Sequence, residues 1–390
     1  MAQTDVIIVG LGAAGAATLH QLTRRGARAV GIDRFSPPHP HGSTHGDTRI
    51  TRLAIGEGAV YTPLVTRSHE IWRELEAETG VRLLTQNGGL VIESPRSDHS
   101  LHHAHGFLDS TIACARRYGI EHEALTAEQM SLRFPQFSLA GDERGYYEPG
   151  AGFVRPETCV ATQLDAAARA GAVVRRDETV IDLTRDGSGV RVRTNLATHV
   201  ADRVVLCVGP WLADFLPASL RGVVSVYRQV LIWYGLRPDA PDHSPDAMPV
   251  FIWGLAGDRH FYGFPAIDGP GGGLKVATEQ FDETTTAATA ALGVDAAEAD
   301  ELHEQLIRDQ LPGVTDRCVK AVRCLYTTTR DGHFLVDWHP DIDGVLLVSP
   351  CSGHGFKHSA GLGDALAAWL TSGASDVDLS PFRIDRLIQV

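Results

Sequence analysis

Apolar positions divide the first thirty-three residues into a strand, a helix and a second strand. Residues 5–9 are a β-branched apolar run, which is typical of a buried parallel strand. Residues 16–25 have apolar side chains at helical spacing, and Gly26 is expected to end that helix. Residues 29–32 are apolar again and lead to Asp33. This order predicts one βαβ unit.

Two similar strand signals occur much later in the chain. Residues 204–208 form one apolar run that ends at Gly209, and residues 344–349 form another. A helical pattern follows the second run over residues 359–370. Mixed α/β character therefore appears at the start, the middle and the end of the sequence.

The stretches between these signals have a different pattern. Residues 86–95 and 225–236 are predicted to be extended strands, and residues 245–280, rich in aromatic residues, Gly and Pro, predict antiparallel strands with turns. The simplest architecture is an α/β dinucleotide-binding domain built from separate segments, with a second sheet domain inserted twice. The expected segments are 1–85, 145–220 and 322–390 for the first domain, and 86–144 and 221–321 for the second.

Composition narrows the classes of partner. The 390 residues are 43% hydrophobic and 21% charged, so a large core needs no disulfide or metal. The net charge of -13 argues against a nucleic-acid surface and against docking on an anionic membrane. A local cluster of Arg and Lys could still bind a small anion. The six cysteines form no CxxC pair, so we expect no metal site. Without a signal peptide or a long apolar span, a cytoplasmic enzyme is expected.

A glycine fingerprint follows the first predicted strand. Gly10, Gly12 and Gly15 have the GxGxxG spacing, and Asp33 follows eighteen residues after the last of them. Glycine permits the sharp turn, the close approach of a pyrophosphate and tight helix packing, while the helix N-terminus attracts phosphate. Asp33 is expected to accept hydrogen bonds from ribose. The strand, helix and acidic residue around the glycines favour a dinucleotide site over an empty turn, but they do not separate NAD from FAD.

Several motifs taken together resemble one family, that of monomeric sarcosine oxidase and N-methyltryptophan oxidase, which are FAD-dependent amine oxidases. The resemblance runs from Asp5 to about Arg383. It implies FAD as the cofactor, and a Rossmann-like FAD-binding domain of the D-amino-acid-oxidase type beside a mixed-sheet substrate domain. The motifs are Gly42-Ser43-Thr44-His45-Gly46-Asp47-Thr48-Arg49 with Arg52, Tyr262-Gly263-Phe264-Pro265, Lys275, Arg323-Cys324-Leu325-Tyr326 and Ser352-Gly353-His354-Gly355-Phe356-Lys357.

The resemblance assigns residues to the cofactor. It implies that the sulfur of Cys324 is joined to the 8α-carbon of the flavin, a reaction that needs a thiolate, which the neighbouring Arg323 could favour. The alternative is a buried structural thiol. His45 and Arg49 are implied to lie beside the flavin. The remaining residues expected to bind FAD are Arg34, Gly353, Gly355, Phe356 and Lys357. A helix that begins near Gly355 is expected to point its dipole at the flavin.

It also assigns residues to the substrate and to oxygen. Arg52 and Lys357 are implied to hold a substrate carboxylate, for which a guanidinium fork and an ammonium are suited. Lys275 is implied to activate oxygen through its positive charge. Tyr262 and Tyr326 match aromatic residues of the cavity, although packing alone would also explain them.

One position departs from the family pattern. The family often has a histidine four residues after the lysine that Lys275 matches, where this chain has Glu279. A carboxylate there favours a cationic or hydrogen-bond-donating substrate, unless Glu279 pairs with a nearby arginine and is only structural. Trp253 is a candidate for reshaping the cavity. Sarcosine itself is therefore in doubt, and N-methyl amino acids and cyclic imino acids stay open as substrates.

The reaction implied is oxidation of a secondary amine next to a carboxylate, with a hydride passing to flavin N5 and O2 reduced to H2O2. A dehydrogenase of the same fold that uses another electron acceptor is the main alternative, and a non-catalytic flavoprotein is a third. The resembled proteins favour a monomer. The only partners expected are the small amine or imino acid and O2.

Overall fold

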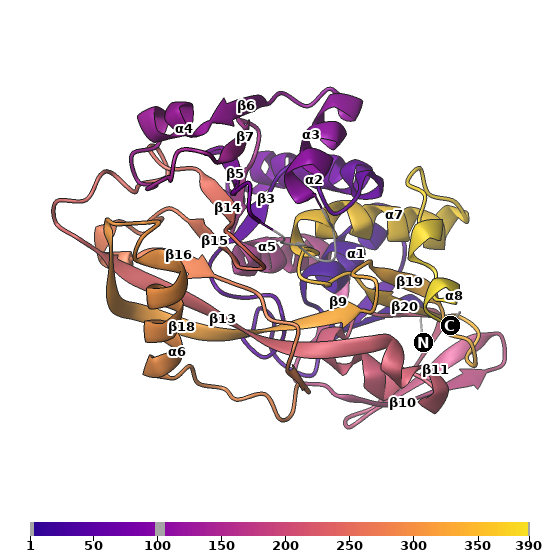
Figure 1. The fold of residues 1–390 in the computed structure, drawn as a ribbon. Helices are drawn as coiled ribbons and strands as arrows, with labels where there is room; N and C mark the ends of the chain where they lie inside the picture. Colours follow the sequence, from indigo (N-terminus) through magenta and orange to yellow (C-terminus); the bar gives the residue numbers. More distant parts are fainter. Residues whose placement is uncertain (1–3, 98–105, 389–390) are drawn as a thin grey trace.

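The computed structural model describes residues 4–97 and 106–388, and their strands form three sheets (Figure 1). In the first, eight-stranded sheet, β9, β2, β1, β12 and β20 lie side by side and run parallel. The predicted strands at the start, middle and end of the chain thus come together as neighbours. The strands of this sheet are β1 (Thr4–Val9), β2 (Ala29–Ile32), β9 (Val173–Arg175), β10 (Val180–Asp186), β11 (Gly189–Thr194), β12 (Thr198–Leu206), β19 (Leu335–Trp338) and β20 (Val345–Ser349).

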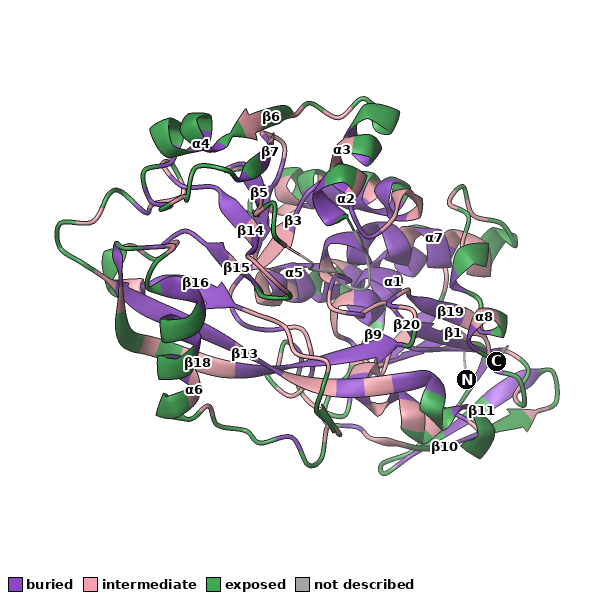
Figure 2. Ribbon diagram, in the orientation of Figure 1, coloured by how far each residue is buried: buried purple, intermediate pink, exposed green. Residues whose placement is uncertain are grey.

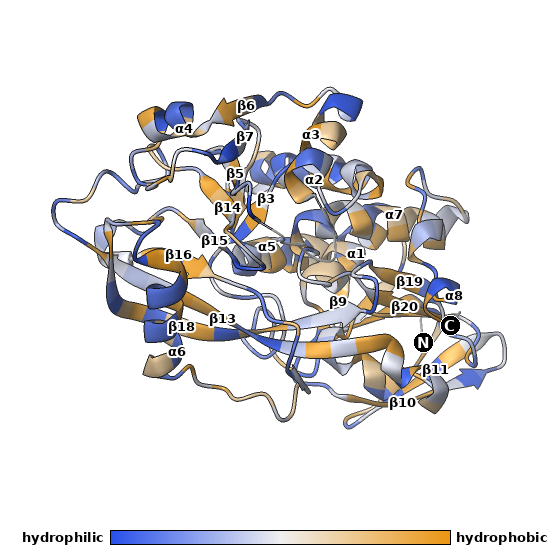
Figure 3. Cartoon of the chain, in the orientation of Figure 1, coloured by the Kyte–Doolittle hydropathy of each residue, from blue (hydrophilic) through white to orange (hydrophobic). Residues whose placement is uncertain are grey.

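Four helices pack together against this sheet. Helix α1 contacts both α5 and α7, and α2 also packs on α7. Buried apolar residues of α1, α2, α5 and α7 belong to one core cluster; α1 and α7 are mostly purple in Figure 2, and orange segments run along α7 in Figure 3. The burial of this apolar surface is what fixes the helices on the sheet. The four helices are α1 (Ala13–Arg24), α2 (Thr62–Thr79), α5 (Pro156–Arg169) and α7 (Ser359–Ser372).

The second sheet has nine strands and is mostly antiparallel. Its long strands β13 and β18 pair along most of their length and cross the lower half of Figure 1. Its strands are β5 (Gly89–Glu93), β6 (Glu123–Thr126), β7 (Arg144–Glu148), β13 (Val224–Leu236), β14 (Val250–Gly254), β15 (His260–Phe264), β16 (Leu274–Ala277), β17 (Thr284–Thr285) and β18 (Val314–Thr329). The helices α3 (Phe107–Tyr118), α4 (Ala127–Arg133) and α6 (Ala296–Leu302) contact strands of this second sheet.

A small third sheet contains β3 (Arg49–Thr51), β8 (Gly152–Val154) and β4 (Leu84–Thr85). Two strands of the second sheet cross boundaries predicted from the sequence: β7 begins before residue 145, and β18 extends on both sides of residue 322. The pairing of β18 with β13 continues through that point without a break. The division into two domains at those residues stays a prediction. No helix in the described part of the chain is long and apolar enough to cross a membrane.

Candidate active site

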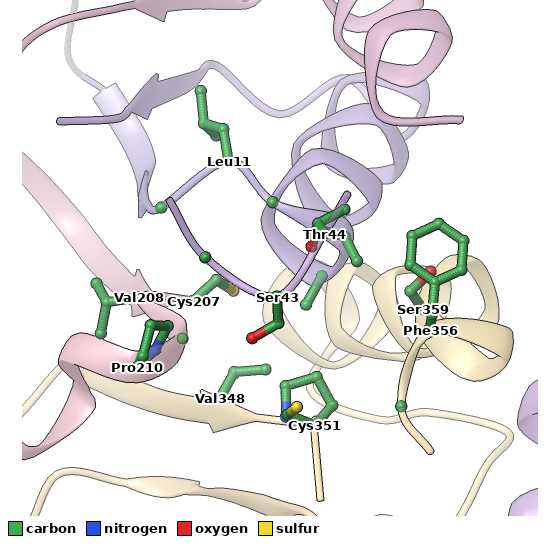
Figure 4. Close-up of a pocket in the computed structure, with 18 of the residues that line it drawn as sticks. Leu11, Ser43, Thr44, Cys207, Val208, Pro210, Val348, Cys351, Phe356 and Ser359 are labelled. Carbon is green, nitrogen blue, oxygen red and sulfur yellow. The ribbon is translucent and has the colours of Figure 1, made fainter. Parts of the chain in front are cut away.

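A cavity of about 570 Å³ extends from the glycine turn of the first sheet to the strands of the second. This volume is within the range of ligand sites. Figure 4 shows its nucleotide end, where four separate segments converge: Leu11, Ser43 and Thr44, Val208 and Pro210, and the stretch with Val348, Cys351 and Phe356. The sequence motifs far apart in the chain therefore meet around one space.

The glycine turn can be built only from glycine at two of its positions. Gly10 has a φ of +86°, and a Cβ there would lie 2.4 Å from the carbonyl oxygen of Cys207. A Cβ on Gly15 would lie 1.8 Å from the carbonyl oxygen of Gly10. Gly12 precedes the first residue of α1, so the N-terminus of that helix opens toward the cavity and suits a phosphate. Gly15 itself does not line the cavity but sets the packing of the turn.

Asp33 has a structural task that the sequence pattern did not reveal. Its two carboxylate oxygens accept hydrogen bonds from the backbone N–H groups of Leu11, at 2.7 Å, and Phe35, at 2.8 Å. The carboxylate therefore fixes the glycine turn, and its remaining lone pairs can still accept from a ribose. The neighbouring Arg34 is exposed, and its guanidinium lies 5.1 Å from the ring centre of Trp211 at the cavity edge.

The segment from Pro350 to Lys357 closes the opposite side of this end. Gly355 is tightly enclosed, since a Cβ there would lie 1.5 Å from the carbonyl oxygen of Pro350. Gly353 has a φ of +80°. Phe356 and Lys357 lie on the short 3-10 helix η6 (Phe356–His358) that leads into α7. The glycine turn, Asp33, the α1 N-terminus and this segment form an elongated cradle that fits a dinucleotide such as FAD.

Strand alternation in the second sheet builds the other wall. On β15, Tyr262 and Phe264 face the cavity, and on β16 Lys275 does the same. Their neighbours in the sequence point into the apolar core on the other face. Trp253, which the sequence suggested for the cavity, lies on that core face and stacks on Phe261, with ring centres 5.7 Å apart. Ile252 lines the cavity instead.

Lys275 is a buried cation held by oxygen atoms. Its Nζ donates hydrogen bonds to the carbonyl oxygens of Gly46, at 2.6 Å, and Thr48, at 2.9 Å, and to the Thr48 hydroxyl at 3.2 Å. Burial, and then the charge of Arg49, lower the pKa of Lys275 well below its ordinary value. The three acceptors oppose this shift, because only the ammonium form can donate three hydrogen bonds.

Arg49, His45 and Cys324 form a cluster beside Lys275, in which His45 and Cys324 are buried and Arg49 is half-buried. Arg49 donates hydrogen bonds to the backbone carbonyls of Ser43 and Thr48, and its Nη2 lies 3.5 Å from Cys324 Sγ. Burial, and then Arg49 and Lys275, lower the pKa of His45 to about 3, so its imidazole is neutral near pH 7. Neither His45 nor Cys324 is among the residues that line the cavity, whereas Arg49 is.

Arg52 and Lys357 come together as predicted, but they share a carboxylate that the sequence analysis missed. Glu57 Oε2 lies 2.5 Å from Arg52 Nη2, and Glu57 Oε1 lies 3.2 Å from Lys357 Nζ. All three side chains are buried and line the cavity. Burial lowers the pKa of Lys357 to about 8, although Glu57 opposes the shift. A carboxylate ligand would have to share these cations with Glu57.

The loop around Glu57 carries one weak signal of this role. Glu57 stands between Gly56 and Gly58, in a stretch that otherwise resembles a surface turn. The start of this loop is held by Glu148, whose carboxylate accepts hydrogen bonds from the backbone N–H groups of Leu53, at 2.6 Å, and Ala54, at 3.1 Å. These contacts fix the segment between Arg52 and Glu57.

Tyr262, Tyr326 and Glu279 line the remaining wall. The two tyrosine hydroxyls lie 3.2 Å apart, and burial raises the pKa of each phenol above its ordinary value, so both are protonated near pH 7. Glu279 Oε2 lies 3.7 Å from His260 Nε2. Of the predicted site residues, only Gly15, His45 and Cys324 lie behind the cavity wall. The chemical roles of all of them stay predictions. Within residues 4–97 and 106–388, no cluster of three or more His, Cys, Asp or Glu side chains could hold a metal ion.

Comparisons with known proteins agree with this arrangement. Residues 5–369 match the family described as FAD dependent oxidoreductase. The monomeric sarcosine oxidase of Streptomyces avermitilis is 35% identical over 98% of this chain and 97% of its own. The N-methyl-L-tryptophan oxidase of Escherichia coli is 31% identical over 98% of this chain and 99% of its own.

A solved structure of NikD, described as an unusual amino acid oxidase essential for nikkomycin biosynthesis, is 25% identical with a TM-score of 0.81, over 98% of each chain. The structural likeness and the two sequence relatives each extend over almost the whole length of this chain. The resemblance inferred from the motifs is confirmed: the chain belongs to the FAD dependent oxidoreductase family, among its sarcosine-oxidase-like flavin-dependent amine oxidoreductases.

Proposed function

We propose that this flavoenzyme oxidises a secondary amine that carries a carboxylate, either an N-methyl amino acid or a cyclic imino acid, and reduces O2 to H2O2. The observation that carries the proposal is the position of the two buried cations Arg52 and Lys357. They lie in the same cavity as the glycine turn, so a carboxylate held there would share one cavity with the flavin. The relatives that share this chain's length are named for N-methylated amino acids and act as oxidases.

The residues of the chain bind and orient the substrate. Arg52 and Lys357 hold the carboxylate, while Tyr262 and Tyr326 offer hydroxyl groups as donors on the facing wall. The apolar side chains of Phe264 and Ile252 exclude water from the space between the two cations and the two tyrosines. When bound, FAD supplies the electron acceptor for the carbon beside the substrate nitrogen. The cysteine behind Arg49, Cys324, is the residue we propose to join covalently to FAD.

Anaerobic bleaching of the flavin tests this function. The holoenzyme is mixed with sarcosine, other N-methyl amino acids, L-proline and L-pipecolate, and absorbance near 450 nm, the flavin band, is followed. We expect at least one secondary amine with a carboxylate to bleach the flavin, while its primary amine and its methyl ester react far more slowly. If no such compound bleaches the flavin, the proposal is wrong. Bleaching without peroxide formation in air would instead identify a dehydrogenase.

Lys275→Met should slow the reaction of the reduced flavin with O2. The buried ammonium can stabilise negative charge as the first electron reaches oxygen, and loss of one such electrostatic contact costs about 100- to 1000-fold in rate. Anaerobic flavin reduction should change only a few-fold. Stopped-flow measurement of both half-reactions separates the two effects.

The matched control is Lys320→Met. Both lysines lie over the ring of Trp233, with Nζ 5.3 Å from the ring centre for Lys275 and 4.5 Å for Lys320. Lys320, however, is 44% exposed, and its Nζ lies 2.6 Å from Asp47 Oδ2. Its loss should leave reoxidation unchanged. Equal rates for Lys275→Met and wild type would exclude an oxygen-activating role for Lys275.

A further inference from the structure

The proposed function leaves open how the substrate loses its proton. An alkylamine such as the lysine side chain has a pKa of about 10.4, so roughly 0.1% or less is neutral at pH 7. Oxidation of the carbon beside nitrogen draws on the nitrogen lone pair, which the ammonium form does not have. A group on the cavity wall must therefore accept a proton, or the enzyme must wait for the rare neutral amine.

Six carboxylates line the cavity among the residues that the structure describes: Asp33, Glu57, Glu178, Asp182, Asp214 and Glu279. Four of them lie at the nucleotide end, on β10, on η2 (Gly209–Phe215), in the turn before β10 or directly after β2. Glu57 is held between Arg52 and Lys357. Glu279 is thus the carboxylate on the second-sheet wall that faces the substrate end.

The register of the second sheet places Glu279 opposite His260. Tyr262 pairs with Ala277 in the β15–β16 ladder, and the same register carried two residues further aligns His260 with Glu279. The facing atoms, Glu279 Oε2 and His260 Nε2, are 3.7 Å apart, and the side chains are 3% and 9% exposed. The two side chains therefore face each other in a buried part of the wall.

Ionisable groups of three other elements face the same carboxylate. The charge of Glu279 acts to raise the pKa of Tyr262 on β15, of Tyr326 on β18 and of Lys357 on η6. The tyrosines are held protonated, and Lys275 on the adjoining strand donates its protons to oxygen atoms. These neighbours present hydrogen-bond donors or cations, whereas Glu279 presents a carboxylate to this end of the cavity.

We infer that Glu279 accepts the proton of the substrate ammonium and that His260 is a positioning residue beside it. This inference rests on the proposed oxidation of a secondary amine. In the step, the N–H bond of the ammonium breaks, its electron pair stays on nitrogen, and an O–H bond forms on Glu279. The proton returns to solvent after the product leaves. The enzyme can then bind the abundant cationic form of its substrate.

The pH dependence of flavin reduction tests the proton transfer. Sarcosine and L-proline are mixed anaerobically with wild-type holoenzyme and with Glu279→Gln between pH 6.5 and 10. We expect the second-order rate constant of the variant to be about 100-fold lower at pH 7 and to rise nearly tenfold per pH unit, because only the neutral amine reacts. The wild-type constant should change much less over this range.

Two further variants complete that experiment. His260→Leu should lower the rate constant only a few-fold and keep the weak pH dependence of wild type, because His260 positions the carboxylate beside it and does not itself accept the proton. Glu283→Gln, at an exposed position four residues later, should follow the wild-type profile. A Glu279→Gln profile that matches wild type overturns the inference.

A binding measurement separates this inference from the proposed function. Glycine betaine carries a permanent positive charge on nitrogen, and propionate has a carboxylate without nitrogen. We expect Glu279→Gln to bind betaine about tenfold more weakly, and propionate unchanged, in calorimetric titrations of the holoenzyme. Unchanged betaine affinity overturns the inference. Weaker betaine binding together with no bleaching by any amine would contradict the proposed function alone and would leave Glu279 facing a cationic nitrogen.

Discussion

Cys324→Ala holoenzyme should release all of its FAD on acid precipitation, leaving a colourless pellet, whereas the wild-type pellet should stay yellow. Attachment of a flavin needs a thiolate, and thiolates form beside fixed cations. Cys324 is fully buried, and its sulfur lies 3.5 Å from the guanidinium of Arg49 and 3.7 Å from the carbonyl oxygen of Ser43. Absorbance of the supernatant and the mass of the denatured chain measure the linkage.

Cys351→Ala is the control that tests whether the linkage is specific to Cys324. Cys351 lines the cavity directly, which Cys324 does not, so position alone would favour it as the attachment site. Burial raises the pKa of the Cys351 thiol, which makes its thiolate rarer. We therefore expect Cys351→Ala to retain bound colour after precipitation. Loss of colour in this variant, with retention of colour in Cys324→Ala, would mean that Cys351 and not Cys324 is joined to the flavin.

The nucleotide half of this site could be predicted from local sequence because its constraints are local. Gly15 is required by a contact within one βα turn, the positive φ of Gly10 belongs to the same turn, and Asp33 follows the next strand. The contact of Gly10 with Cys207 is the long-range exception. The apolar runs that predicted β1, β2, β12 and β20 could be recognised because buried parallel strands favour continuous apolar sequence, whereas their order in the sheet came only from the structure. The fold class and a dinucleotide cofactor follow from such short-range patterns, whereas FAD in particular came from the family resemblance.

The substrate half could be predicted only in part, because its contacts join distant segments. The pairing of Glu57 with Lys357 spans 300 residues, and a glutamate between two glycines gives no sign of being buried. The position of Trp253 was wrong by one residue of strand alternation, which is enough to turn a side chain from the cavity to the core. His260 gave no signal before the β15–β16 register was known.

Arg52→Met should weaken carboxylate binding by roughly 30- to 3000-fold, the range expected when one partner of a buried, hydrogen-bonded charge pair is removed. Propionate titration of the holoenzyme measures this effect without turnover. The affinity left in the variant depends on Lys357, whose pKa is lowered to about 8. Arg52 is one of the charges that lower this pKa, so its removal raises the pKa of Lys357, and the residual affinity should fall only as the pH rises above 8. Affinity equal to wild type would exclude Arg52 from the carboxylate site.

The same variant should also lower the free energy of unfolding by about 3 kcal/mol, because the carboxylate of Glu57 stays buried with one of its two cations gone. The double variant Arg52→Met/Glu57→Gln removes that charge as well, and it should recover stability without recovering affinity for propionate. Arg144→Met removes an exposed arginine that pairs with Glu93 and Asp109, and it should cost less than about 1 kcal/mol. Recovery of both stability and affinity in the double variant would mean that Arg52 serves only to neutralise Glu57, and that Lys357 alone binds the substrate carboxylate.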